Sequence, residues 1–156
     1  MEKERFKLIP LYDLNAVLKT WHLYQDGLEM ILNNSGEDTN LTKVFNDIMS
    51  GKLLLWIGFV DGVYAGFLTT SFQQIFEGPK YGWVVHTYKR ISVPTDFLLE
   101  GLNQIEVFFK DQQCDYIKFY ALKKPWQDKL VLLGYKPMYI EYLKSLKEEK
   151  KGEDIN

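Results

Sequence analysis

Hydrophobic residues in the first third of the chain recur at helical spacing. Apolar side chains fall near every third or fourth position of 11–32, which predicts one or two helices. The apolar stretch 5–10 before it ends at a proline and predicts a short first strand. A second amphipathic segment, 41–51, ends at a glycine and predicts a short helix.

The middle of the chain has the pattern of a β-hairpin. Two strand-like apolar runs, 53–60 and 63–72, flank the dipeptide Asp61-Gly62. A two-residue Asp-Gly link between such runs is a strong hairpin signal, because both residues tolerate positive φ. A polar turn follows, and 81–90 is expected to form a third strand.

The last part alternates between helical and strand patterns. Apolar residues at i, i+4, i+7 and i+11 of 95–112 predict a long helix with one stripe facing a sheet. Strands are expected at 114–122 and 139–146, with a helix at 124–133 between them. The strand–helix–strand order of 81–122 predicts a right-handed crossover with two parallel strands.

These elements predict an α/β fold with a mixed, mostly antiparallel sheet and helices on both faces. The 156-residue length fits one domain. We expect this domain to cover 1–146 and a charged, solvated tail to cover 147–156.

Composition and charge exclude several classes of function. The net charge of −2 argues against nucleic acid or an anionic membrane as a partner. The longest apolar run, 53–60, is too short to span a bilayer, and no apolar stretch of a secretory signal is seen at the start. One cysteine, Cys114, permits no intrachain disulfide, so a reducing, cytoplasmic location is expected. One cysteine and two histidines offer no ligand cluster for zinc, and no metal is expected.

The order of elements, with several landmarks, resembles the GNAT superfamily of N-acetyltransferases. The landmarks are the Asp61-Gly62 hairpin, the strand–turn–helix of 81–112, the strand entry "QCDYIKF", and "KLVLLGYK" at 129–136. Short GNAT-like proteins carried by phages are similar. The resemblance implies a single GNAT-like domain whose central parallel strands splay apart. It also implies transfer of an acetyl group from acetyl-CoA to an amine.

The resemblance places acetyl-CoA between strands 83–88 and 115–120. The pantetheine arm would pair with the backbone of the first strand, and the pyrophosphate would bind the turn before the long helix. The residues on the matching positions are Val84, Val85, His86, Arg90, Val93 and Thr95.

The phosphate turn departs from the family pattern. Val93 and Thr95 stand where small residues, usually glycines, let the backbone approach phosphate oxygens. Pro94 between them lacks an N–H donor, and an anionic Asp96 would repel a diphosphate. The turn is therefore either an altered cofactor loop or a structural turn in which Thr95 caps the helix.

Two residues are candidates for proton transfer. His86 has an ordinary pKa suited to a general base, and on an alternating strand it would share a face with Val84 and Tyr88. The family's general-acid tyrosine is replaced by Leu130, and Tyr120 is a candidate substitute. Packing within the sheet is the alternative for both candidates.

Two functions remain open. The first is an acyl-CoA-dependent N-acyltransferase, with acetyl-CoA as donor, a small-molecule or protein amine as acceptor, and His86 or an ordered water as base. The second is a catalytically inactive GNAT-fold protein that binds protein partners, for example a phage virion or host-interaction component. Its location would then be the host cytoplasm or the virion.

Overall fold

The computed structural model describes residues 5–34, 39–90, 92–94, 96–120, 124–138, 142 and 144–147, except for the side chains of 97, 98 and 125. The chain divides into two compact units, Met1–Leu122 and Lys123–Asn156.

The first unit contains a five-stranded sheet in which the strands follow each other in chain order. Neighbouring strands are antiparallel except for the last two, which are parallel. This confirms the mixed, mostly antiparallel sheet and the parallel crossover. The strands are β1 (Phe6–Pro10), β2 (Leu54–Val60), β3 (Val63–Gln74), β4 (Lys80–Lys89) and β5 (Tyr116–Phe119).

The hairpin predicted at Asp61-Gly62 joins β2 to β3. Both residues have positive φ, 48° and 81°, and the register continues from Val60 and Val63 on either side. The turn is thus a two-residue link of the primed type, which matches the twist of the paired strands.

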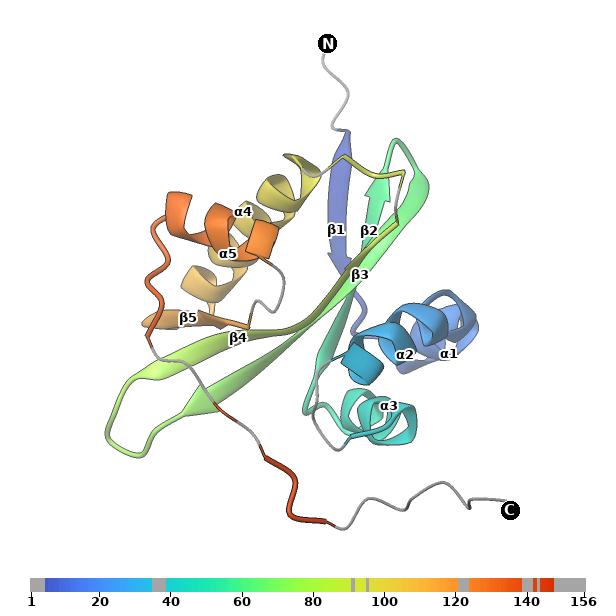
Figure 1. Ribbon diagram of the computed structural model, residues 1–156. Helices are drawn as coiled ribbons and strands as arrows, with labels where there is room; N and C mark the ends of the chain where they lie inside the picture. Colours follow the sequence, from blue (N-terminus) through green and yellow to red (C-terminus); the bar gives the residue numbers. More distant parts are fainter. Residues whose placement is uncertain are drawn as a thin grey trace, which may run out of the picture. The chain divides into compact units, whose positions relative to one another are not determined.

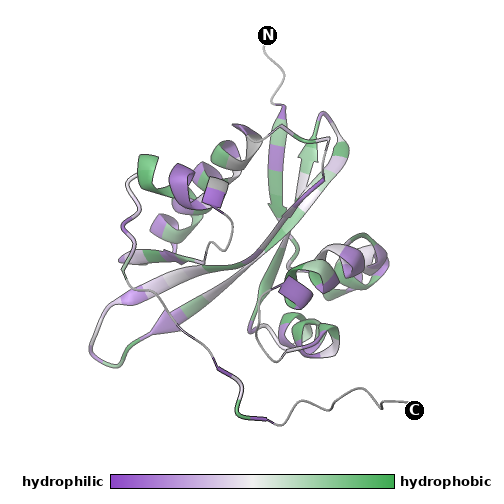
Figure 2. Cartoon of the chain, viewed as in Figure 1, coloured by the Kyte–Doolittle hydropathy of each residue, from purple (hydrophilic) through white to green (hydrophobic). Residues whose placement is uncertain are grey.

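Three helices and a short 3-10 turn cover one face of the sheet (Figure 1). They are α1 (Leu14–Thr20), η1 (Trp21–Leu23), α2 (Gln25–Asn34) and α3 (Leu41–Met49). Their buried residues form one core with residues from β2 and β3, including Leu55, Ile57 and Phe67. Figure 2 shows hydrophobic and hydrophilic residues alternating around these helices, as the amphipathic pattern predicted.

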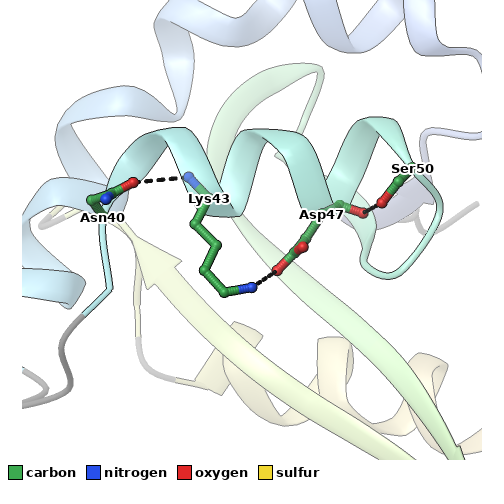
Figure 3. A network of polar contacts seen from close by, with 4 residues as sticks. All are labelled: Asn40, Lys43, Asp47 and Ser50. Carbon is green, nitrogen blue, oxygen red and sulfur yellow. Dashed lines mark hydrogen bonds and ion pairs between the residues drawn. The ribbon is translucent and has the colours of Figure 1, made fainter.

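The start and end of α3 are held by local polar contacts (Figure 3). Asn40 caps the helix, since its Oδ1 accepts the N–H of Lys43 at 2.9 Å. Lys43 Nζ lies 3.1 Å from Asp47 Oδ2, one turn further on. Ser50 Oγ donates to the Asp47 carbonyl oxygen at 3.3 Å. An asparagine cap of this kind typically stabilises a helix by about 1 kcal/mol.

The long helix α4 (Asp96–Asp111) covers the opposite face. Ile105 and Phe109 are fully enclosed and form a second core with Trp56 and Val84. The predicted apolar stripe is therefore confirmed. Gly82 makes this packing feasible, because a Cβ at that position would overlap the Phe109 ring.

The second unit contains α5 (Lys124–Leu132), as predicted. Gly134, with φ of 91°, ends the helix, and the Tyr135 N–H donates to the Leu130 carbonyl oxygen at 3.0 Å. The strand expected at 139–146 is not formed by residues 142 and 144–146, and the rest of that stretch lies outside the described residues.

Within the described ranges, no helix combines the length and the apolar character needed to cross a membrane.

Candidate functional site

The parallel ladder between β4 and β5 ends halfway along β4. Residues 81–84 of β4 pair with Tyr116–Phe119, and the last pair is Val84 with Phe119. Residues 86–89 still pair with β3 on one side, but on the other side they have no ladder partner in the described part of the chain. The two parallel strands therefore part after Val84, in the region where the resemblance implies a cofactor.

A β-bulge lies at the point where the strands part. Thr69 pairs with His86 and Thr70 pairs with Val84, so Val85 is an inserted residue without a partner on β3. Bulges of this kind turn the side chains beyond them to the other face and are frequent beside functional sites.

The bulge corrects one prediction about His86. Val84 is buried in the core under α4, whereas Tyr88 packs on the core under α1–α3. Because His86 and Tyr88 are two residues apart beyond the bulge, they share a face. The expectation that Val84 lies on that same face was wrong, since simple alternation does not hold across an inserted residue.

Beyond the bulge, one side of the β4 backbone has no ladder partner among the described residues. The His86 N–H donates to Thr69 Oγ1 at 3.1 Å, and the Arg90 N–H donates to a β3 carbonyl oxygen at 2.9 Å. Successive N–H groups along a strand point to opposite sides. The N–H groups of Thr87 and Lys89 therefore point away from β3. We call the backbone groups of Thr87 and Lys89 the open edge of β4.

The open edge is not visible in the sequence. The family resemblance points to Val84, Val85 and His86, but Val84 is still paired with β5 and the His86 N–H is bonded to Thr69. Locating the free donors requires the bulge and the end of β5, and neither leaves a clear signal in the local sequence.

His86 forms a close pair with Thr69. Thr69 Oγ1 lies 2.7 Å from His86 Nδ1, and the threonine side chain is fully buried. The hydroxyl already accepts the His86 N–H. Nδ1 is the one acceptor found for the hydroxyl proton among the described residues. The neutral ring then carries its own proton on Nε2.

This arrangement does not suit a general base. Burial lowers the pKa of His86 from 6.5 to about 4, because a charged ring would lose its hydration. The ring is therefore neutral near pH 7, and its unprotonated nitrogen is occupied by Thr69. What remains available is an N–H donor at Nε2. Nothing in the sequence singles out Thr69, since a strand threonine is usually only a packing residue.

Residues 92–94, the described part of the turn before α4, offer few donors for a phosphate group. The Val93 N–H donates to the Arg90 carbonyl oxygen at 3.0 Å, and Pro94 has no N–H. Asp96 is the first residue of α4 and places a carboxylate at the helix N-terminus. Thr95, the predicted cap, lies outside the described residues. Of the described residues Ser92, Val93 and Pro94, only Ser92 keeps an N–H that could face a ligand.

The Arg90 side chain reaches toward β3. Its Nη1 is 3.4 Å from the carbonyl oxygen of Tyr64 in β3. The backbone N–H of Arg90 donates to the carbonyl oxygen of Ala65, also in β3. The guanidinium thus lies on the side of β4 opposite the open edge.

Tyr120 directly follows the last residue of β5. Its side chain is 47% exposed and meets the Trp83 ring edge-on, with the ring centroids 5.1 Å apart. Since Val84 and Phe119 form the last ladder pair, Tyr120 stands where the two strands part.

Aromatic rings pack on the His86 side of the sheet. Phe67 stacks on Tyr88 at 5.4 Å, and Tyr24 contacts Phe67 at 5.5 Å. Gly27 of α2 lies directly over the stack, because a Cβ there would be 2.9 Å from both Phe67 and Tyr88. Burial raises the pKa of the nearby Tyr64 phenol well above its ordinary value, so Tyr64 stays neutral and is a poor proton donor.

Two alternative chemistries receive no support. The described residues contain no group of three or more His, Cys, Asp or Glu that could hold a metal ion. Partial burial raises the pKa of the Cys114 thiol, which keeps it protonated and weakly nucleophilic.

Comparisons with known proteins agree on the fold. No family model and no curated protein matches the sequence. Solved structures do match. A predicted acetyltransferase with acetyl-CoA from Clostridium acetobutylicum is 15% identical, with 88% of this chain and 96% of the other covered and a TM-score of 0.64. A GCN5-related N-acetyltransferase from Ralstonia eutropha is also 15% identical, with 90% and 98% covered and a TM-score of 0.67.

A third match is a ribosomal-protein-alanine N-acetyltransferase from Brucella melitensis. It is 10% identical, with 91% of this chain and 99% of the other covered and a TM-score of 0.68. These matches cover nearly the whole of both chains at low identity. The protein therefore has the fold of the GCN5-related N-acetyltransferases, the GNAT superfamily that its sequence resembles.

Proposed function

We propose that the protein is an N-acetyltransferase that takes an acetyl group from acetyl-CoA and transfers it to an amine. The observation that carries this proposal is the open edge of β4. Thr87 and Lys89 offer backbone donors and acceptors in strand geometry, beside a parallel strand that ends at Phe119. An extended chain with amide groups, such as the pantetheine arm, can add to such an edge like another strand.

The reaction needs positioning more than it needs reactive side chains. The acceptor nitrogen attacks the thioester carbonyl carbon, a C–N bond forms and the C–S bond breaks. The amine loses one proton and the leaving thiolate takes up one proton. Holding the thioester on a rigid strand would supply much of the rate enhancement, because it replaces a random encounter with a fixed geometry.

Tyr120 is the proposed general acid for the thiolate. Its exposed side chain stands where β4 and β5 part, and a phenol O–H is a group that can donate a proton to a leaving thiolate. His86 is not assigned the role of base, because Thr69 occupies its Nδ1. Water is the proposed proton acceptor for the amine.

The proposed acceptor is an amine-bearing small molecule or a protein amine. Similar folds in the comparisons include an enzyme named for a protein acceptor, the ribosomal-protein-alanine N-acetyltransferase. The described residues form no acceptor site specific enough to choose between these two classes.

Calorimetric titration with acetyl-CoA tests the donor. We expect a dissociation constant between about 1 μM and 1 mM, and release of free thiol when a suitable amine is added. Tyr120→Phe should lower the rate of thiol release at least about tenfold and leave the dissociation constant unchanged. No heat at millimolar acetyl-CoA would reject the proposal.

A second function is favoured by the turn before α4. The bonded N–H of Val93, the missing N–H of Pro94 and the replacement of the family tyrosine by Leu130 fit a GNAT-fold protein that has lost catalysis. Such a protein would act by binding protein partners, in a virion or on a host protein if a phage encodes it. Absence of acetyl-CoA binding, together with a biological role that survives Tyr120→Phe, would favour this function.

A further inference from the structure

The hairpin formed by β3 and β4 extends past the end of β2 (Figure 1). The last ladder pair between β2 and β3 is Leu54 with Thr70, whereas β3 stays paired with β4 as far as Gln74. In the described part of the chain, residues 71–74 therefore have a strand on one side only. We call residues 71–78 the arm. An unpaired strand edge presents backbone N–H and C=O groups that can bind another strand.

The arm displays large apolar side chains to solvent. Phe72 is 44% exposed, Ile75 is 45% exposed and Phe76 is 89% exposed. Single exposed apolar residues are normal on a protein surface. Three of them within five positions, beside an unpaired strand edge, form a patch of the kind that contacts a partner.

The tip of the arm is held in one conformation that presents Phe76. The Gly78 N–H donates to the Ile75 carbonyl oxygen at 2.8 Å, which closes a turn with Phe76 in its second position. Gln74 Nε2 donates to the Gly78 carbonyl oxygen at 3.0 Å. Glu77 has a φ of 56°, in the left-handed region that favours glycine. A turn fixed in this way loses little conformational freedom when its exposed ring binds a partner.

The edge of the arm lacks the usual protection against pairing. Residues 71–74 read Ser-Phe-Gln-Gln, without the charged residues or prolines that commonly block exposed edges. Two copies of this edge can therefore pair antiparallel without placing like charges opposite each other. Identical antiparallel strands are related by a two-fold axis, the commonest symmetry of protein oligomers. The occupant that fits this neutral, self-complementary edge is a second copy of the chain.

Strand geometry selects the register of such a pair. Residues opposite each other in an antiparallel pair lie on the same face of the sheet, so a two-fold axis places one residue opposite its own copy. With Phe72 on the axis, Gln74 of one copy would lie opposite Thr70 of the other. That position is already taken by Leu54. With Gln73 on the axis, the two arms pair along their length and β2 is undisturbed.

We infer that two copies of the chain dimerise through their arms, so that one sheet continues across a two-fold axis at Gln73. The backbone groups of residues 71–74 gain partners, and the rings of Phe72 and Phe76 lose contact with water. Burial of these rings contributes most of the affinity, because the net gain from each hydrogen bond is small. The open edge of β4 lies beyond Val84, at the opposite end of the strand, so the inference does not depend on the proposed function.

Disulfide cross-linking locates the interface in the full chain. Cys114→Ser removes the native thiol, and Gln73→Cys then places two thiols on the axis, where opposite Cα atoms of an antiparallel pair are about 4.5–5.5 Å apart. This separation suits a disulfide, so we expect a dimer on a non-reducing gel that dithiothreitol reverses. Asn103→Cys, at an exposed position of α4, is the matched control and should remain monomeric. Cross-linking of Gln73→Cys no stronger than that of the control would overturn the inference.

Sedimentation velocity measures the association of the wild-type chain. We expect a dissociation constant for the dimer between about 1 and 100 μM. Gln73→Lys should weaken the dimer at least about tenfold, since it places two like charges opposite each other, whereas Asn103→Lys should leave it unchanged. Circular dichroism verifies that each variant is folded. A wild-type chain that stays monomeric up to about 500 μM, or a dimer that Gln73→Lys does not weaken, would overturn the inference, and the occupant of the arm would then be a different protein.

Discussion

The Thr69 hydroxyl is the hydrogen-bond partner of two groups of His86, the backbone N–H and the ring Nδ1. The bulge at Val85 brings about this arrangement, because it places His86 opposite Thr69 in the ladder. His86, a candidate catalytic base in the sequence, is thereby a half-buried residue whose ring is bonded to Thr69. Two predictions follow from the pair.

Removing the Thr69 hydroxyl should destabilise the protein. Thr69→Val keeps the shape but leaves the His86 N–H and Nδ1 without a partner, and an unsatisfied buried polar group costs about 1–3 kcal/mol. Urea denaturation should show this loss. The matched control, Thr69→Ser, retains the hydroxyl and should lose clearly less. Equal stability of the two variants would contradict the proposed pairing.

Stability should fall as the pH is lowered from about 7 toward about 4. The pKa of His86 is 6.5 when exposed and about 4 in the fold. In this interval the unfolded chain binds a proton that the folded chain does not, so acid favours unfolding. Since the ring is only partly enclosed, we expect about 1–3 kcal/mol in total. His86→Gln should remove this part of the pH dependence, and an unchanged profile in that variant would refute the assignment.

Alternate backbone N–H groups of β4 point to opposite sides of the strand, either toward β3 or toward the open edge. The N–H groups of His86 and Arg90 bind β3, and those of Thr87 and Lys89 form the open edge. A proline substitution removes one N–H at a time, so it can distinguish these two sides of the strand.

Thr87→Pro should leave the sheet folded but weaken binding of acetyl-CoA at least about tenfold, because it deletes a donor of the open edge. Tyr88→Pro is the matched control. It removes an N–H directed at β3 and should destabilise the fold by about 3 kcal/mol or more. Circular dichroism and calorimetry measure the two effects. Loss of folding in Thr87→Pro with retention in Tyr88→Pro would show that the N–H directions are reversed.

Helix α2 approaches the sheet closely at Gly27. Gly27→Ala would raise helix propensity by about 1 kcal/mol, but its Cβ would lie 2.9 Å from the stacked Phe67 and Tyr88 rings. We expect a net loss of about 1–2 kcal/mol in thermal or urea unfolding, since overpacking of a rigid core costs more than the propensity gains. Glu29→Ala, at an exposed site of the same helix, should be neutral or stabilising. A stabilised Gly27→Ala would show that α2 is free to move away from the sheet.

Both hydrophobic cores belong to the first compact unit. All residues of the two core clusters found in the described ranges lie between Leu8 and Phe119, inside Met1–Leu122. The sheet is likewise built from residues 6–119. Burial of these cores supplies most of the free energy of folding.

A chain that ends after Leu122 is therefore expected to fold. It should unfold cooperatively in urea and keep the circular dichroism signal of the sheet and of α1–α4, with the loss limited to α5. The full chain is the control. A non-cooperative transition in the shortened chain would show that the second unit is needed for the fold.

Element types were largely predictable, and the site was not. The Asp61-Gly62 turn, the apolar stripe of α4 and the glycine after α5 are local signals. The structure confirmed the element that each of them predicted. The strand expected at 139–146 shows the limit of such signals. A strand exists only through its partner, and residues 142 and 144–146 do not form one.

The sequence by itself determined the order of helices and strands and the parallel crossover, because helix periodicity, turn chemistry and the handedness of the crossover act over short distances. Only the tertiary structure decided where β5 ends, that Val85 forms a bulge, and that the N–H groups of Thr87 and Lys89 point away from β3. Register and bulges depend on how one strand meets another, and a shift of one residue exchanges every side chain between faces. For that reason the open edge of β4 could be located only once the strands were paired.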